Sequence, residues 1–346
     1  MMINMKHNMK KIFLSVISLA ACFCASAQMM PDSTVQVVAY WAKGDKISYE
    51  CKTTEYEIDE AGTKTVQSAT SETRVFDVLD ADENGYKLRL SYEDVFSPSK
   101  VPYLTDEQMK ELNENMSLTF KTDEFGTDIE VIDDAEAFGS FEKMVDEICE
   151  GAWKENKALL KKATTKEQYF SSMKSMLCNK EYIHAALLAD FSPMLMFHGA
   201  RLDTSEVYTF PQSFLNLLNS GGSMEVETQF WVDEKLTDTT SVVLCSDAYI
   251  DSEKMAPVMK ASLLNMMKST LEGLGQEYNE AECLAAIEEQ IESTKMETTF
   301  EEYTSEQIHL GTGWPICWYS TREVVMSTIQ GEKKTVIEKS VELKRD

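Results

Sequence analysis

Apolar and polar residues alternate in many short stretches of this chain, which is the pattern of half-buried strands. Near the start, Ile47, Tyr49 and Cys51 are separated by single polar residues. Asn84-Gly85 lies between two alternating runs, an arrangement typical of a tight hairpin. The same pattern predicts further strands at residues 74–79, 86–90, 118–120, 129–132, 206–210, 224–232, 241–249, 296–303, 314–328 and 335–343.

The spacing of the apolar residues becomes helical in two regions. The first follows Asp134, and within it Thr164-x-x-Glu167 resembles a capping box that opens a further helix. The second region carries an apolar stripe over several turns, and Asn279-x-x-Glu282 begins another helix after it. The stripe consists of Met255, Val258, Met259, Leu263, Met266, Met267 and Leu271.

Strands, helices, strands, helices and strands therefore follow one another along the chain. This order favours an α+β fold over a doubly wound parallel one. The sheet is expected to be curved, half-barrel-like and mainly antiparallel, and to be covered by the inserted helices. We predict one domain over residues 28–346, with helical insertions at about residues 134–200 and 251–292. A division into two domains between Gly199 and Thr204 is the alternative.

The first residues have the pattern of a secretory signal peptide, residues 1–27. Three lysines precede an apolar run that is shorter than the about 20 residues of a spanning helix. Two kinds of processing fit this region. Ala25-Ser26-Ala27 forms an A-x-A cleavage site, whereas Leu19-Ala20-Ala21-Cys22 resembles a lipobox, in which Cys22 would carry lipid. We therefore expect an exported protein, periplasmic or at the cell surface, anchored to the outer membrane if Cys22 is lipidated.

Removal of the signal leaves 30 basic and 59 acidic residues, a formal charge of −29. Such a surface repels nucleic acid and anionic headgroups, so a nucleic-acid partner is excluded. No segment after the signal is apolar for long enough to span a membrane. The hydrophobic content of 43% is too high for a disordered chain.

Six cysteines follow the signal region, and none forms a C-x-x-C pair. An even number of thiols in an oxidising compartment permits up to three disulfides. Wide spacing in a chain of this length is equally compatible with buried free thiols, because a large core does not need cross-links. Both alternatives stay open at this point.

Local motifs for metal binding and catalysis are missing. Asp80, Asp82 and Asn84 match the first half of an EF-hand loop, but Ser91 stands at the twelfth position, where a bidentate glutamate is needed. The histidines lack the spacing of a helical zinc site, and the chain has no nucleophile elbow or glycine-rich phosphate loop. We predict no catalytic residue, no metal and no cofactor. An exported hydrolase whose site is assembled from distant residues is the third hypothesis for function.

The methionine stripe is the strongest candidate for a binding surface. Methionine adapts to varied apolar partners, although a helix that packs on its sheet is the more common origin of such a stripe. Helices over a curved sheet can leave an apolar cavity between the layers. The residues predicted to line it are Met255, Met259, Met266, Met267, Tyr182, Phe191, Phe197 and Trp231.

Three short segments carry a resemblance to known proteins. They are Tyr40-Trp41-Ala42-Lys43-Gly44-Asp45-Lys46, Thr122-Asp123-Glu124-Phe125-Gly126-Thr127 and Thr312-Gly313-Trp314-Pro315. Together with the exported start, they resemble uncharacterised secreted proteins of the Bacteroidota. The layout of such proteins is similar to that of LolA-like lipoprotein carriers, in which a curved sheet and covering helices enclose a hydrophobic cavity. The resemblance transfers no functional residue to this chain.

The leading hypothesis is an exported non-catalytic protein that binds an apolar ligand between sheet and helices. The ligand would be a lipid, an acyl chain or a lipidated partner protein. The alternative is an envelope interaction or scaffold protein that holds a partner through its acidic surface or a sheet edge.

Overall fold

A computed structural model of the protein describes residues 33–93, 103–178, 188, 191–215, 223–273, 277–329 and 331–344. The predicted signal region, including the lipidation candidate Cys22, lies outside these residues, and so does Tyr182.

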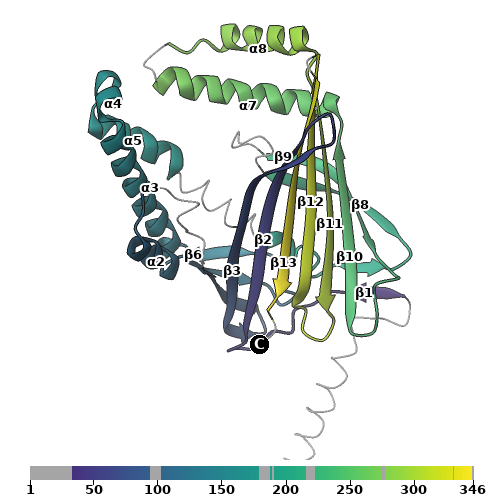
Figure 1. The fold of residues 1–346 in the computed structure, drawn as a ribbon. Coiled ribbons are helices and arrows are strands. Elements are labelled where there is room, and N and C mark those ends of the chain that lie inside the picture. Colours follow the sequence, from purple (N-terminus) through teal and green to yellow (C-terminus); the bar gives the residue numbers. More distant parts are fainter. Residues whose placement is uncertain are drawn as a thin grey trace, which may run out of the picture.

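Most strands belong to one antiparallel sheet of 11 strands, in the order β6-β5-β4-β3-β2-β13-β12-β11-β10-β9-β8 (Figure 1). The sheet is open, with β6 and β8 at its edges. The predicted α+β class and mainly antiparallel sheet are therefore confirmed. The strands are β2 (Lys46–Ile58), β3 (Lys64–Asp82), β4 (Gly85–Glu93), β5 (Ser117–Thr122), β6 (Glu130–Asp133), β8 (Val207–Leu215), β9 (Ser223–Val232), β10 (Ser241–Ile250), β11 (Glu297–His309), β12 (Pro315–Thr328) and β13 (Gly331–Leu343).

Two antiparallel meanders make up this sheet. The first runs from β2 to β6, and the second runs from β8 to β13. They join where β13, the last strand, pairs with β2 over residues 334–343. Residues on both sides of the alternative domain boundary at 199–204 thus lie in one sheet. Strands β1 (Thr34–Gln36) and β7 (Arg201–Asp203) pair separately as a small second sheet.

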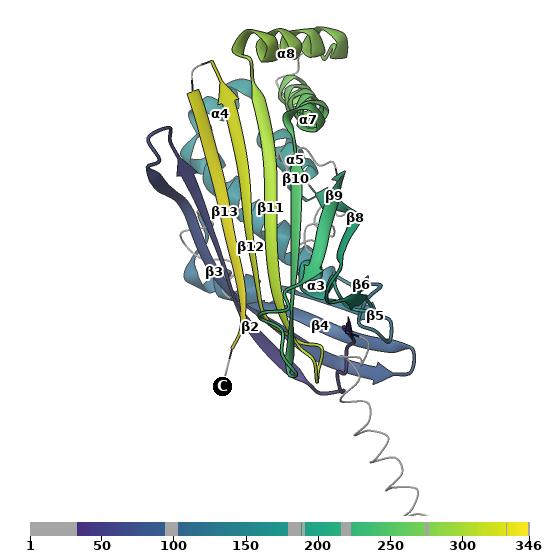
Figure 2. The ribbon, with the colours of Figure 1, turned by 90° about the vertical axis from the view of Figure 1, so that its right-hand side faces the viewer.

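The helices form two units. They are α2 (Asp106–Glu114), α3 (Ala135–Glu155), α4 (Lys157–Ala163) and α5 (Lys166–Leu177) in the first, and α7 (Ser252–Gly273) and α8 (Glu280–Thr294) in the second. Helix α3 packs against β5 and α5, and α7 packs against β11 and α8. Figure 1 shows α7 and α8 crossing the end of the long strands, while α2–α5 stand beside one face of the sheet. In Figure 2 the same helices α3–α5 lie behind the sheet.

The helix starts follow local chemistry. Helix α5 begins with a capping box in which Thr165 and Gln168 exchange hydrogen bonds, one residue later than the predicted Thr164-x-x-Glu167. The predicted start of α8 is confirmed, because the Asn279 side chain accepts from the backbone N–H of Glu282 at 3.4 Å. The hairpin at Asn84-Gly85 is also confirmed: Gly85 has φ 129° and pairs with Asp82.

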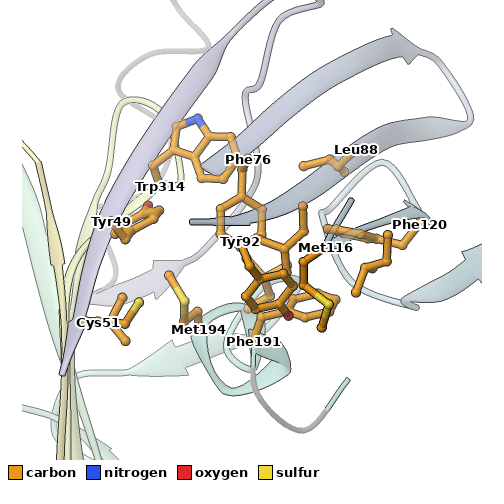
Figure 3. Packing of buried hydrophobic residues seen from close by; sticks show 14 of the residues in the cluster. Tyr49, Cys51, Phe76, Leu88, Tyr92, Met116, Phe120, Phe191, Met194 and Trp314 are labelled. Atoms are coloured by element: carbon orange, nitrogen blue, oxygen red, sulfur yellow. The ribbon is translucent and has the colours of Figure 1, made fainter. Parts of the chain in front are cut away.

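One face of the sheet, called here the inner face, holds the core. Directly paired residues of an antiparallel sheet share a face, so the register assigns each side chain to one side. A first cluster joins the inner face of β2–β5 to α2, α3 and the short 3-10 helix η1 (Ser192–Leu195). Figure 3 shows part of this cluster, with Phe76, Phe120 and Phe191 close together. A second cluster lies between β9–β11 and the β1–β7 pair, and a third joins β8–β11 to Met255 of α7.

The six cysteines after the signal region are all free thiols in this structure. Four of them are buried, and Cys178 and Cys317 are half-buried. Of the two alternatives left open by their spacing, the described structure therefore has the free thiols.

The three short segments behind the resemblance meet in space, at a place called here the motif junction: Trp41, Gly126, His198, Gly313 and Trp314. The rings of Trp41 and Trp314 stack with centroids 4.4 Å apart. Gly313 has φ 75°, and a Cβ there would lie 2.4 Å from the Val38 carbonyl oxygen. The segments are thus explained by close packing between distant parts of the chain, and they carry no reactive constellation.

Candidate functional site

A row of inner-face side chains crosses the middle of the sheet and contains one carboxyl group. The register from β9 to β2 places Val232, Leu244, Glu306, Trp318, Val341 and Cys51 side by side. Val232 and Leu244 belong to the second core cluster, whereas Trp318, Val341 and Cys51 belong to the first. Glu306 therefore stands where the two apolar clusters meet.

Glu306 is completely buried, with 0% of its surface exposed. Neither of its carboxyl oxygens has a hydrogen-bond partner. A buried carboxylate without a partner is far less favourable than the neutral acid. Burial accordingly raises the pKa of Glu306 well above its ordinary value of 4.5. Burial without a partner therefore favours the neutral carboxylic acid.

Trp318 lies directly opposite Glu306 on the neighbouring strand β12. Its indole Nε1–H is also buried and has no acceptor. Buried polar groups are nearly always hydrogen-bonded, so two orphaned groups on paired residues are an exception that needs a cause. Leaving such groups unsatisfied costs about 1–3 kcal/mol each. We call Glu306 and Trp318 the polar pair.

The polar side chains next to the polar pair are satisfied. Ser246 and Thr304 share a hydrogen bond of 2.5 Å in the adjoining row of the inner face. One row further, Glu302 accepts from Ser320 at 3.2 Å and from Arg322 Nε at 2.5 Å. The fold thus provides partners for polar groups on these same strands. Thr298 Oγ1 and Asp247 Oδ1 on these strands are also buried without a partner, but in the polar pair two such groups lie directly opposite each other.

The hydroxyl of Tyr49 interacts electrostatically with Glu306, and it already has a hydrogen-bond partner. Its O–H donates to the Pro315 carbonyl oxygen at 2.9 Å. Burial first, and the nearby Glu306 second, raise the pKa of Tyr49 well above 10. The phenol therefore stays neutral, and its O–H is not available as a hydrogen-bond donor to Glu306.

A second pair of orphaned polar atoms lies in the motif junction. His198 Nε2 donates to the Gly313 carbonyl oxygen at 2.8 Å, which leaves Nδ1 as a buried acceptor without a partner. Trp41, whose ring centroid is 5.6 Å from that of His198, has a buried Nε1–H without an acceptor. Trp41, His198 and Gly313 lie in loops, outside the paired rows of the inner face. The motif junction therefore holds loops together.

The predicted ligand-binding residues are not brought together. Phe191 belongs to the first core cluster, Phe197 to the second and Met255 to the third. Met259 is buried and Met267 is half-buried on α7, while the side chain of Met266, like all of Tyr182, lies outside what the structure describes. Trp231 faces the opposite side of the sheet, where it contacts Tyr303.

Sequence reasoning missed Glu306, although a signal was present. Phe300, Glu302, Thr304, Glu306 and Ile308 alternate along β11 and so share one face. Phe300 and Ile308 are fully apolar, which marks this face as the buried one. A glutamate at the same alternating positions places an unusual carboxyl group on the buried face.

Other candidate sites are accounted for by local structure. The half EF-hand pattern lies beside a surface hollow of about 240 Å³ at the β3–β4 hairpin. Its acids are used by the protein: Asp80 pairs with Lys43 at 3.1 Å, and Asp82 accepts from the Asn84 N–H at 2.7 Å. Within the described residues, no group of three or more His, Cys, Asp or Glu could hold a metal ion. In the same part of the chain, no helix is long and apolar enough to span a membrane.

Comparisons with known proteins add little to this picture. No protein-family model and no curated protein matches the chain. Among solved structures, it is similar to one described as "Lipid-protein interactions in lipovitellin", with a TM-score of 0.38 and 10% sequence identity over 88% of this chain. The chain spans 25% of the length of that protein.

We expect His198 to contribute to the stability of the fold at neutral pH and to lose this contribution in acid. Burial lowers the pKa of this imidazole from 6.5 to about 4. Between these values the unfolded chain binds the proton and the folded one does not, so this contribution falls by up to about 1.4 kcal/mol per pH unit on acidification. Comparing chemical unfolding of the protein with that of His198→Gln at pH 7 and pH 5 tests this. Equal pH dependence in the two proteins would contradict it.

Proposed function

We propose that this chain is an exported, non-catalytic protein that binds an apolar ligand carrying one polar group, on the inner face of the sheet. The polar pair carries the proposal. Binding sites for small apolar molecules are lined mainly by hydrophobic and aromatic side chains with a few polar groups that fix orientation. Glu306 and Trp318 fit that description, because they are unpaired polar groups within an apolar row.

The arrangement of the elements supports this function. The long strands form one wall, α7 crosses their end, and α2–α5 stand beside the inner face (Figure 1). Apolar side chains of the inner face beyond the polar pair are Phe300, Val324, Met326 and Ile337, which lie on three adjacent strands. In this proposal the two helical units cover the ligand, in the manner that the resemblance to LolA-like carriers implied.

The distance along the sheet suits a long acyl chain. Glu306 and Phe300 are six residues apart on β11, which corresponds to about 20 Å of strand. Between them, the hydroxyls of Ser246 and Thr304 bond to each other and Arg322 bonds to Glu302. These groups therefore lose no partner when an alkyl chain covers them.

Lipid uptake tests the proposed function directly. We expect native mass spectrometry of freshly purified protein to show a carried lipid, and the delipidated protein to take up the apolar probe diphenylhexatriene. A clean unliganded mass together with no uptake would refute the function.

Two neighbouring valines provide matched variants. Val324 and Val325 are both half-buried on β12 but face opposite sides of the sheet. We expect Val324→Glu, on the inner face, to reduce uptake strongly, and Val325→Glu to leave it near the wild-type level, with circular dichroism confirming that both fold. Equal loss in both variants would speak against an inner-face site.

The alternative of an envelope interaction protein has one feature in its favour. Edge strand β8 exposes Val207 by 59% and Phe210 by 52%, so a partner strand could pair there. Native mass spectrometry also separates the two functions, because a bound lipid favours the first and a bound protein favours the second.

A further inference from the structure

The geometry of the polar pair restricts the chemistry of its ligand. Glu306 and Trp318 are directly opposed on adjacent strands, and such side chains have Cβ atoms about 4.5–5.5 Å apart. Both polar ends are buried and both lack a partner. A single ligand atom placed between them can therefore contact both groups at once.

The protonation of Glu306 decides what that atom must be. Indole Nε1–H is a donor only, and a neutral carboxylic acid has an O–H donor and a carbonyl acceptor. Along the inner face, Arg322 is bound to Glu302, and Lys339 of β13 lies in the row next to the polar pair, opposite Ser320. The polar pair, with Glu306 neutral, thus offers two donors to a ligand.

We propose that the polar pair binds the carbonyl or carboxylate oxygen of an acyl ligand, with Glu306 O–H and Trp318 Nε1–H as its two donors. This inference rests on the proposed function and names the ligand's polar group. An ester carbonyl and a fatty-acid carboxylate share the required acceptor oxygen. An alkylammonium offers only donors, so it could reach the Glu306 carbonyl oxygen but would leave the Trp318 Nε1–H without an acceptor.

The titratable groups that face Glu306 from the neighbouring strands are Tyr49 and Lys339. Leu244 and Trp318 flank Glu306 on β10 and β12, Tyr49 interacts with it from β2, and Lys339 lies in the next inner-face row on β13. Cys317 lies on the opposite face of the sheet, and burial raises the pKa of its thiol. Ionisation of Glu306 at high pH would remove its donor and repel a carboxylate, so binding of a fatty acid is expected to weaken as pH rises.

Displacement of diphenylhexatriene by ligands with the same tail tests the inference. The ligands are palmitic acid, methyl palmitate and hexadecylamine, measured on the delipidated full-length protein. We expect palmitic acid and methyl palmitate to bind, and the amine to bind at least about ten-fold more weakly, the effect of losing one satisfied buried hydrogen bond or more. A preference for the fatty acid over the ester, or the reverse, identifies the source of the acceptor oxygen.

Three variants assign the effect to the polar pair. Glu306→Met and Trp318→Phe each remove one donor, and we expect each to weaken the binding of palmitic acid about ten-fold more than the binding of diphenylhexatriene. Glu306→Gln keeps an N–H donor, so it is expected to retain binding and to lose the pH dependence. Tyr319→Phe, next in the chain but on the other face, is the matched control.

The outcomes separate the inference from the proposed function. If the probe binds but palmitic acid binds equally well to wild type, Glu306→Met and Trp318→Phe, the inference is wrong and the proposed function stands. Tighter binding of hexadecylamine than of palmitic acid also overturns the inference. If neither probe nor ligand binds the wild type, both fail.

Discussion

Replacing Glu306 with methionine is expected to stabilise the protein, and by more at higher pH. Methionine has a similar length and flexibility, and it removes a buried group that has no hydrogen-bond partner. The gain is about 1–3 kcal/mol near pH 5, the cost of an unsatisfied buried polar group. A binding role would explain why the protein has a residue that lowers its stability in this way.

The pH dependence has a definite sign. Because the pKa of Glu306 is raised on folding, the folded chain holds a proton that the unfolded chain has released above pH 4.5. Its contribution to stability is fully present below pH 4.5 and is lost as pH rises toward the folded pKa, at up to about 1.4 kcal/mol per pH unit. The advantage of Glu306→Met over wild type therefore grows with pH.

Urea unfolding between pH 6.5 and 8 measures this effect separately from His198. The folded His198 is neutral over this range because its pKa there is about 4, and the unfolded one, with a pKa of 6.5, is almost fully neutral above about pH 7.5, so the slope above that pH is free of its contribution. Glu306→Gln is the control, because it cannot ionise but leaves a polar group buried. It should show a flat pH profile without the full gain of methionine. A destabilised Glu306→Met at every pH would contradict this interpretation of the site.

Replacing Trp314 with alanine is expected to destabilise the protein by about 3–5 kcal/mol, the usual cost of removing a large buried aromatic side chain. Trp314 is 5% exposed and stacks on Trp41, and its ring centroid lies 5.9 Å from that of Phe76. It joins the loop before β12 to the segment before β2, so its loss opens a cavity between parts far apart in sequence.

The urea midpoint of Trp314→Ala, compared with that of Leu236→Ala, checks this prediction. Leu236 is 62% exposed, and its truncation should change stability by no more than about 0.5 kcal/mol. An unchanged m-value would show that both variants unfold as wild type does. A loss below about 1 kcal/mol for Trp314→Ala would mean that the motif junction does not hold the fold together.

Local patterns predicted much of the secondary structure, because strands and helices follow short-range rules. Alternation located the long strands β2 and β10–β13, and Asn84-Gly85 located a hairpin. Helix α2 was missed, since only Met109 and Leu112 are buried on it, although its Thr105–Gln108 capping box was readable. The pairing of β13 with β2 joins the two ends of the chain, and no local pattern encodes such a contact.

The candidate site was harder to predict, because it depends on which face each side chain occupies. Trp231 was grouped with the methionine stripe, yet its neighbours Phe230 and Val232 are the ones that face the core. In a strand, a shift of one residue exchanges the two faces. The isolation of Glu306 could not be predicted at all, since it follows from the absence of partners on β10 and β12.

The most direct measurement is the infrared spectrum of the delipidated protein at pH 7, compared with that of Glu306→Gln. We predict a carbonyl band of a protonated carboxylic acid in the wild type, absent from the variant, that shifts when palmitic acid is added. A spectrum with no such band would show that Glu306 is ionised, and a band that palmitic acid leaves unchanged would show that the ligand does not reach it.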